Sequence, residues 1–265
     1  MSRIIIDLEN KYFCYLMGLL WADGYIYSSH RTKNRIDITM TFDDINQLAY
    51  IFNKTGEWRK YERNRKNNNY KRQLNFRTID AHLYMFMKEM EYDIKSKTSP
   101  SKIISKLSSE MKKYFIKGLF DGDGCFYYKN NTRQCTITSN YDQDWKFMQD
   151  ILNEIGCKNS ICRQKSRSGN RSCIRITSRD IIKFGEYLYS DNELVGIARK
   201  YEKFKEIESS YLTNKSRVGN NKKKVYINGL KFSSISEAST KTGLTRSSIR
   251  YRLKSIKYTE YYYSS

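Results

Sequence analysis

Alternating hydrophobic and polar residues predict several β-strands. In residues 35–42 the even-numbered side chains are Ile, Ile, Met and Phe, and the odd-numbered ones are Arg, Asp, Thr and Thr. Residues 73–77 and 173–176 show the same alternation, with Leu, Phe or Ile at every second position. Successive side chains of a strand point to opposite faces, so each strand has one apolar face and one polar face. This pattern predicts antiparallel sheets that are buried on one side.

Two apolar, helix-like stretches end in the same way. "YLMGLLWADG" ends at Asp23 and Gly24, and "FIKGLFDGDG" ends at Asp123 and Gly124, an offset of 100 residues. Amphipathic segments at 44–54 and 144–154 follow at the same offset, and each stops just before a glycine suited to a helix end. The first 212 residues therefore read as two diverged copies of one unit.

The predicted fold class is α+β, with two pseudo-symmetric αββαββα halves that contain antiparallel sheets, and a small domain after them. We expect the first half at 7–97, an inter-half linker or short connecting helix at 98–109, the second half at 110–212, a basic linker at 213–223 and the small domain at 224–257. In that domain, strands near 225–227 and 231–232 precede a helix at 235–242, a turn and a second helix from Thr245. This order resembles a helix-turn-helix module.

The charge of the chain points to a polyanionic partner. There are 49 Lys and Arg residues against 28 Asp and Glu, a net charge of +21. Nucleic acid is the first candidate and an anionic membrane surface the second. The apolar run 12–22 is too short to span a bilayer and nothing resembles a secretory signal, so we expect an intracellular, cytoplasmic protein with no membrane partner. The six cysteines form no Cys-x-x-Cys pair, which makes a zinc site improbable and indicates reduced packing residues.

The outward faces of the predicted strands are rich in basic, amide and tyrosine side chains. Such residues read base edges and phosphates, and a β-ribbon fits the DNA major groove. We therefore expect these faces to bind double-stranded DNA, with contacts from the small domain added. The candidate DNA-binding residues are Arg59, Tyr61, Arg63, Lys71, Gln73, Arg77, Arg163, Lys165, Arg171, Arg175, Arg246, Ser248 and Arg250.

The two aspartates that end the apolar helices are the candidate catalytic site. Gly18 and Gly118 lack side chains, so the helices that carry them can approach closely. If the two copies pack through these helices, Asp23 and Asp123 meet at one end. Two neighbouring carboxylates repel each other unless a cation lies between them, and their oxygen atoms suit Mg²⁺ (or Mn²⁺). Such a metal can activate water against a phosphodiester.

These residues carry a resemblance to a known family. "LMGLLWADG" and "IKGLFDGDG" resemble the two motifs of a single-chain LAGLIDADG homing endonuclease, and the αββαββα order is similar to that of the family's halves. The segment 224–255 resembles the nuclease-associated modular domain. The resemblance implies antiparallel β-saddles that straddle a long DNA site. It also implies metal-dependent double-strand cleavage of that site, with the metal ligands at Asp23 and Asp123. Trp21 departs from the motif at its sixth letter, which is not the usual metal ligand.

The resemblance also implies supporting residues around the site. A polar residue at the end of the second strand of each half helps to position water, which indicates Thr41 and Asn140. A basic residue after the last helix of each half supports the site electrostatically. Lys97 and Lys200, in the matched segments "IKSKT" and "IARKY", are the candidates, and simple phosphate contact is an equal alternative for them.

The hypothesis from the sequence is a sequence-specific homing endonuclease that acts as a monomer, because one chain holds both halves. Two alternatives stay open. One is an intron RNA-splicing maturase, which would bind RNA, and the other is a non-catalytic DNA-binding regulator. The presence of both Asp23 and Asp123 favours the nuclease, since neither alternative needs both acids.

Overall fold

The chain divides into two compact units, residues 1–209 and 210–265. The computed structural model describes residues 4–27, 34–63, 72–92, 99–165, 169–215, 224–255 and 257–263. Lys71 and Lys97, two of the predicted site residues, lie outside the described residues, and so does the side chain of Arg63. Among the helices of the described ranges, none has the length and apolar composition needed to cross a membrane.

The first half of unit 1 alternates helices with strand pairs. Its elements are α1 (Lys11–Asp23), β1 (Gly24–Tyr27), β2 (Arg35–Thr41), α2 (Phe42–Gln47), α3 (Ala49–Thr55), β3 (Arg59–Arg63), β4 (Gln73–Thr78) and α4 (Ala81–Glu89). α1 begins after Asn10, whose side-chain oxygen accepts hydrogen bonds from the N–H groups of Tyr12 and Phe13. This cap satisfies backbone donors that have no partner within the helix.

The second half repeats this order. Its elements are α6 (Ser109–Asp123), β5 (Gly124–Lys129), β6 (Thr132–Asn140), α7 (Lys146–Glu154), β7 (Asn159–Gln164), β8 (Arg171–Thr177) and α8 (Asp180–Leu188). A short helix, α5 (Ser101–Lys106), joins the halves, and α9 (Ala198–Lys215) follows α8. The expected linker at 98–109 thus contains a helix.

The two sheets have the same topology. Their strand orders are β1-β2-β4-β3 and β5-β6-β8-β7, and every pair described by register is antiparallel. Gly24 pairs with Ile38, whereas Gly124 pairs with Ile137, so the offset between the halves falls from 100 to 99 at the second strand. The predicted α+β class with two pseudo-symmetric halves is confirmed.

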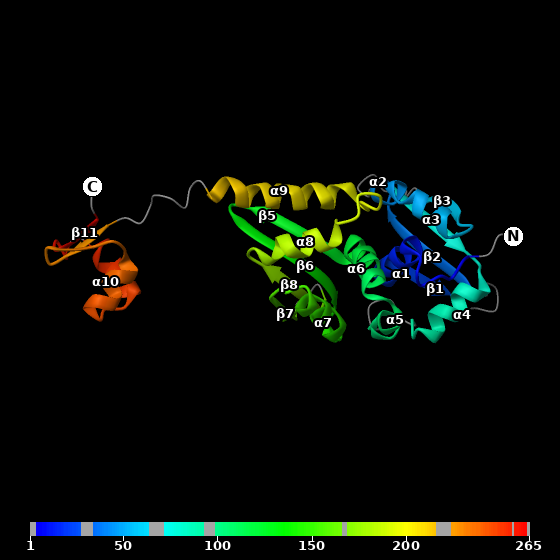
Figure 1. The fold of residues 1–265 in the computed structure, drawn as a ribbon, viewed down its shortest axis with the longest axis horizontal. Coiled ribbons are helices and arrows are strands. Elements are labelled where there is room, and N and C mark those ends of the chain that lie inside the picture. The colour runs from blue at the N-terminus through cyan, green and yellow to red at the C-terminus, as the bar shows by residue number, and fades with distance from the viewer. Residues whose placement is uncertain are drawn as a thin grey trace. The chain divides into compact units, whose positions relative to one another are not determined.

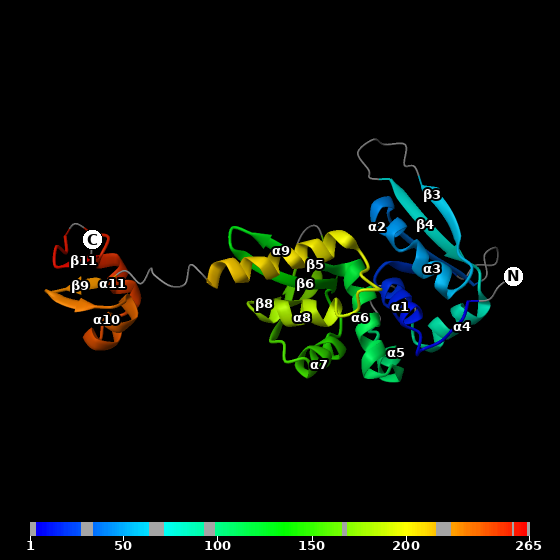
Figure 2. The ribbon, with the colours of Figure 1, turned by 45° about the horizontal axis from the view of Figure 1, so that its top comes forward.

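Figures 1 and 2 show α1 and α6 side by side, with one sheet on each side of the pair. The contact is backbone to backbone, because a methyl group added at Gly18 would lie 1.9 Å from the carbonyl oxygen of Phe115. One added at Gly118 would lie 2.0 Å from the carbonyl oxygen of Tyr15. The inferred role of these glycines is therefore confirmed: only a residue without a Cβ lets the helices pack this closely.

One predicted helix is divided. The amphipathic segment at 44–54 forms α2 and α3, which are separated at the buried residue Leu48. The N–H of Leu48 bonds the carbonyl of Ile45, three residues back, and the Leu48 carbonyl bonds the N–H of Ile51. These hydrogen bonds join residues three apart instead of four, so they tighten the turn and interrupt the regular α-helix. The matching segment in the second half is one helix, α7.

The small domain has its own sheet and core. β9 (Val225–Ile227) lies between β10 (Leu230–Phe232) and β11 (Tyr261–Tyr263) in the sheet. Two helices, α10 (Ile235–Thr242) and α11 (Arg246–Arg252), connect β10 to β11 along the chain. The core contains Val225, Ile227, Phe232, Ala238, Ile249 and Tyr261. Gly243, with φ of +70°, ends α10, and Thr245 caps α11. The predicted helix-turn-helix order is confirmed, and β11 extends the domain beyond the expected end at 257.

Candidate active site and nucleic-acid interface

Asp23 and Asp123 are the last residues of α1 and α6. The two helix ends meet closely: a methyl group added at Gly122 would lie 2.2 Å from Cβ of Ala22 and 3.1 Å from Oδ2 of Asp23. The carboxylate of Asp23 therefore lies beside the residue that precedes Asp123. Both aspartates are half-buried. The structure thus brings together the two acids that the sequence singled out.

Each of these helix ends is held by one buried side chain, and the two side chains differ. The hydroxyl of Tyr92 donates to the carbonyl oxygens of Leu20, at 3.0 Å, and Gly24, at 2.8 Å. Lys200 Nζ donates at 2.7 Å to each of the equivalent carbonyls, Phe120 and Gly124, and to that of Asp121. The last carbonyls of a helix have no partner within it, so these bonds satisfy them and fix the residues that carry the acids.

Nearby carboxylates change the pKa values of the capping residues Tyr92 and Lys200. Burial raises the pKa of Tyr92 well above its usual value, and the charges of Asp23 and Asp123 raise it further. Burial lowers the pKa of Lys200, although the attraction of Asp121 and Asp23 opposes this effect. Lys200 is only 4% exposed and all three described hydrogen bonds go to backbone carbonyls. Its position fits a group that supports the helix end, not one that reaches outward to DNA phosphates.

The side chain equivalent to Lys200 in the first half is a tyrosine. The sequence match of "IKSKT" with "IARKY" did not indicate Tyr92, which follows α4 and precedes the matched segment. Chemically, the two side chains have only a terminal hydrogen-bond donor in common. A comparison based on residue type therefore could not have paired them, and only the shared carbonyl targets reveal the equivalence.

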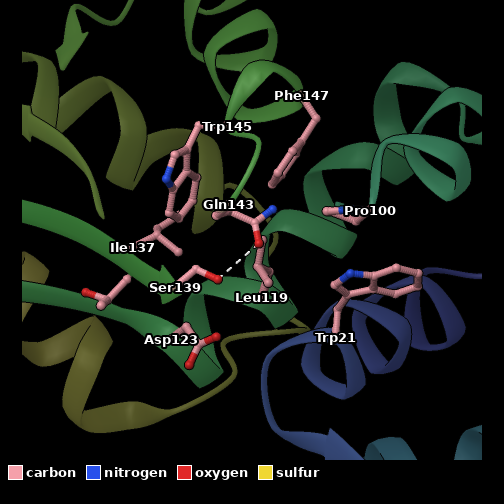
Figure 3. A pocket seen from close by; sticks show the side chains of 10 residues that line it. Trp21, Pro100, Leu119, Asp123, Ile137, Ser139, Gln143, Trp145 and Phe147 are labelled. Atoms are coloured by element: carbon pink, nitrogen blue, oxygen red, sulfur yellow. Dashed lines mark hydrogen bonds between the residues drawn. The ribbon is translucent and has the colours of Figure 1, made fainter. Parts of the chain in front are cut away.

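A small pocket opens beside Asp123 (Figure 3). Trp21 of α1 and Pro100 lie on one side of it, and Trp145 and Phe147 lie on another. Polar side chains line it too: Ser139 donates a hydrogen bond of 3.1 Å to Gln143, and Thr138 follows Ile137 on β6. Trp21, the residue that departs from the motif, thus forms a wall of the pocket next to the acid of the other half.

Thr41 and Asn140 occupy equivalent places, because the change of offset to 99 applies to both β2 and β6. Thr41 donates a hydrogen bond of 2.9 Å to Asp44, which Arg199 of the second half also binds. The side-chain oxygen of Asn140 is buried and has no hydrogen-bond partner among the described residues. Their expected role near the reacting water stays a prediction.

The structure adds residues that the sequence did not single out. Thr138 lies two positions before Asn140, on the same face of β6, and Gln143 lies in the loop that follows this strand. Strand alternation could have indicated Thr138. Nothing in the sequence distinguished Gln143 from other loop residues.

The polar face of the first sheet contains the expected residues Arg59, Tyr61, Gln73 and Arg77, which lie on neighbouring strands. A buried acid, Asp37, modifies its charge, because Arg35 and Arg77 both donate to this carboxylate. Burial alone would raise the pKa of Asp37, but these two hydrogen bonds outweigh burial and hold it below its usual value. Arg77 therefore has an internal partner and is not solely a free contact for DNA.

The candidate arginines of the second sheet lie on both of its faces. Arg171 and Arg175 lie on the polar face, opposite Gln164 and Ser160. Arg163 pairs with the buried Ser172 and so points to the other face, where it donates to the carbonyls of Tyr141 and Gln143. Arg163, one of the candidate DNA-binding residues, thus does not share the polar face of Arg171 and Arg175. Without the register, the alternation of β7 could be assigned either way.

Lys165 lies on the same side as Arg163, with its ammonium 5.3 Å from the centre of the Tyr141 ring. In the small domain, Arg246 and Arg250 are exposed on α11, whereas Ser248 is half-buried and its N–H bonds the capping residue Thr245. Arg163 and Lys165 thus lie away from the polar face that holds Arg171 and Arg175, and the role of the listed residues in DNA binding stays a prediction.

The paired carboxylates fit a hard divalent cation. Mg²⁺ is usually held by one or two carboxylates and keeps several waters, and it does not need a cage of protein ligands. The described residues contain no group of three or more His, Cys, Asp or Glu side chains that could form such a cage. Asp23 and Asp123, half-buried at adjacent helix ends, are the donors that this chain offers.

Comparison with known proteins supports this description. Residues 110–189 match the family model of the LAGLIDADG-like domain, and residues 213–263 match that of the DNA-binding domain of intron-encoded endonuclease 1. No curated protein matches the chain.

Several solved structures have a similar fold. The homing endonuclease I-WcaI bound to its DNA recognition sequence is 16% identical, with a TM-score of 0.53 over 74% of this chain and 88% of that one. A structure of mesophilic variants from the homing endonuclease I-DmoI is 19% identical, with a TM-score of 0.50 over 70% and 98% of the two chains. The I-LtrWI LAGLIDADG homing endonuclease bound to target DNA is 16% identical, with a TM-score of 0.50 over 78% and 92%.

At these identities the structural likeness establishes the fold, and the family models identify two segments of the sequence. Residues 110–189 therefore resemble the LAGLIDADG-like domain, unit 1 has the fold of these homing endonucleases, and residues 213–263 resemble the DNA-binding domain of intron-encoded endonuclease 1.

Proposed function

We propose that this chain is a homing endonuclease that cleaves both strands of a long, asymmetric DNA site by metal-dependent phosphodiester hydrolysis. The observation that carries the proposal is the meeting of Asp23 and Asp123 at the ends of two helices that pack backbone to backbone. Close packing through Gly18 and Gly118 is needed to bring two acids from separate halves to one place. A protein that only binds nucleic acid has no need for it.

The chain's own residues would prepare this site for a phosphodiester. Asp23 and Asp123 would hold Mg²⁺ or Mn²⁺ through carboxylate oxygens, and Tyr92 and Lys200 would keep the backbone around them fixed. When bound, the metal would lower the pKa of a coordinated water and stabilise the leaving oxygen. Thr41 and Asn140, at the equivalent strand ends, are the candidates for orienting water, and Lys97 is the further candidate for electrostatic support.

The two sheets and the small domain would hold the DNA. The polar faces present Arg59, Tyr61 and Gln73 on one side, and Arg171 and Arg175 on the other. Arg246 and Arg250 of α11 would add phosphate contacts. Because neutralised phosphates release counterions, we expect binding to weaken steeply as salt increases. One chain holds both halves, so we propose that it acts as a monomer.

The first prediction concerns the two acids. Asp23→Asn and Asp123→Asn should each reduce double-strand cleavage by about 100-fold or more, since each removes a charged metal ligand. Binding to the same DNA in Ca²⁺ should survive, because the sheet faces are unchanged. The measurement is cleavage of a randomised duplex library in Mg²⁺, followed by sequencing of the ends, which also gives the target.

Asp43→Asn is the matched control, because this aspartate is exposed in the first turn of α2. It should cleave as wild type does. Wild-type protein that binds DNA but leaves it intact in both Mg²⁺ and Mn²⁺ would overturn the nuclease proposal in favour of a DNA-binding regulator. Selective binding of a structured intron RNA, together with no cleavage, would indicate the splicing maturase.

A further inference from the structure

Two cysteines face each other on the polar side of the second sheet. Cys162 of β7 and Cys173 of β8 are direct partners in the antiparallel register, and both line the same open pocket. All six cysteines of the chain are free thiols. We propose that Cys162 and Cys173 form a dithiol site that exchanges reversibly with a small disulfide of the glutathione type and closes into a cross-strand disulfide.

The geometry of an antiparallel pair suits this reaction. Direct partners on one face have Cβ atoms about 4.5–5.5 Å apart. A disulfide needs Cβ atoms about 3.5–4.5 Å apart and Cα atoms about 4.4–6.8 Å apart. A shift of about 1 Å between neighbouring strands would therefore be enough. β7 lies at the edge of the sheet, so it can move without disturbing a strand beyond it.

The thiols interact with each other and with nearby arginines. Burial raises the pKa of Cys173, and a hydrogen bond with Cys162 raises it further. The positive charges of Arg175 and Arg171 oppose this rise. The pocket is also lined by Gln134, Thr136, Thr138, Gln164, Arg171 and Arg175. Two cationic side chains thus lie beside the thiols, where they limit the rise in the pKa of Cys173 and attract an anionic disulfide.

The reaction balances without a metal. One thiolate attacks a sulfur of oxidised glutathione, forms a mixed disulfide and releases one glutathione thiolate. The second protein thiolate then attacks its neighbour's sulfur, forms the Cys162–Cys173 bond and releases the second glutathione. The protein is oxidised by two electrons, the external disulfide is reduced to two thiols, and a reducing thiol reverses both steps.

The pair is specific to the second half. At the equivalent positions of the first sheet, Tyr61 pairs with Asn75. Thr138 pairs with Cys173 and also lines the pocket beside Asp123. The dithiol is therefore separated from the candidate active site by one neighbouring strand position. If the proposed function holds, a mixed disulfide would place an anionic tripeptide where a phosphate backbone should lie, and would weaken DNA binding.

The test uses the full-length protein in buffers with increasing ratios of oxidised to reduced glutathione, quenched by acid and alkylation. Peptide mass spectrometry should find a Cys162–Cys173 disulfide in wild type that dithiothreitol removes. Cys162→Ser and Cys173→Ser should form only mixed disulfides. Cys125→Ser is the matched control, since Cys125 is exposed on β5 with Thr136 as its partner, and it should still form the disulfide.

The proposal is overturned if Cys162 and Cys173 stay reduced while Cys125 forms mixed disulfides, or if the disulfide joins another pair. This readout does not depend on cleavage or on DNA. A second arm compares duplex binding in Ca²⁺ by reduced and glutathione-modified Cys173→Ser, where we expect a loss of roughly tenfold. An unchanged affinity there, with the disulfide observed, would leave the dithiol in place and contradict the DNA-facing assignment of this pocket.

Discussion

At the scale of single residues, the close contact between α1 and α6 depends on the absence of a side chain at two glycines. Gly18 and Gly118 face the carbonyl oxygens of Phe115 and Tyr15 so closely that a methyl group at either position would overlap them. Backbone atoms of a packed helix cannot move aside as a flexible side chain can. These two residues therefore control the distance between the halves, and through it the distance between Asp23 and Asp123.

The second prediction follows from this contact. Gly18→Ala should lower the free energy of unfolding by about 1–3 kcal/mol or more, because the helices must separate to admit the methyl group. Cleavage should fall further than the change in stability explains, since the acids move apart. Urea unfolding and cleavage rates measure the two effects. Ser109→Ala, at an exposed position of α6, is the control and should alter neither.

The third prediction concerns Lys117, a buried lysine in the second motif. Its side chain is 1% exposed, its ammonium lies 3.8 Å from the centre of the Tyr189 ring, and it finds no hydrogen-bond partner among the described residues. Burial lowers the pKa of Lys117 from 10.5 to about 8, opposed by the charges of Asp121 and Asp191 and aided by that of Lys113.

A lowered pKa in the folded state fixes the sign of the pH effect. Between about pH 8 and 10.5 the unfolded chain binds more protons at Lys117, so the wild-type free energy of unfolding gains from this group as pH rises. Lys117→Met lacks this titrating group, so the free energy of unfolding of wild type minus that of the variant should rise between about pH 8 and 10.5. Urea unfolding at several pH values measures this difference, with Lys112→Met as control. A difference that stays constant or falls with pH would contradict the assignment.

At the scale of elements, the ends of α1 and α6 are held by chemically different groups. Tyr92 is neutral and bonds two carbonyls, whereas Lys200 bonds three. The two halves share a fold, yet the electrostatic surroundings of their acids differ. Trp21 and the pocket beside Asp123 add to this difference.

The fourth prediction tests this asymmetry. Tyr92→Phe removes only the hydroxyl and should cost about 1 kcal/mol of stability. It should slow cleavage of one DNA strand more than the other, because it loosens the end of α1 and leaves that of α6 intact. Strand-specific end labels on a duplex target resolve the two rates. Tyr84→Phe, on α4, is the control, and equal slowing of both strands by Tyr92→Phe would indicate a purely structural role.

At the scale of the whole molecule, the chain joins two units with separate cores. The small domain has its own buried cluster around Ile249 and Val225. Its exposed arginines extend a basic chain of net charge +21. Such a domain would add affinity through phosphate contacts and leave the chemistry to the first unit.

The fifth prediction separates these roles. The double variant Arg246→Ala with Arg250→Ala should bind DNA more weakly and reduce the slope of log K against log salt by about 2, if each arginine neutralises one phosphate. Cleavage at saturating protein should be unchanged. Fluorescence anisotropy over a salt series measures the slope. Lys146→Ala, whose ammonium is paired with Asp150, is the control for loss of a positive charge.

The sequence by itself determined the repeat, the order of elements and the two acids. These features depend on local patterns, since alternation, helical spacing and a recurring Gly-x-x-x-x-Asp-Gly are visible without distant contacts. The α+β halves and the helix order of the small domain were predictable for the same reason. Cys162 and Cys173 were visible as residues, but not as partners.

Only the tertiary structure decided which residues meet. The face of Arg163 depends on the register of β7 against β8. The hydroxyl of Tyr92 donates to the carbonyl of Leu20, 72 residues earlier, and Arg77 binds Asp37 of another strand. Each of these contacts joins segments that are far apart in the chain. Their geometry depends on packing and register, which no local pattern of hydrophobic and polar residues specifies.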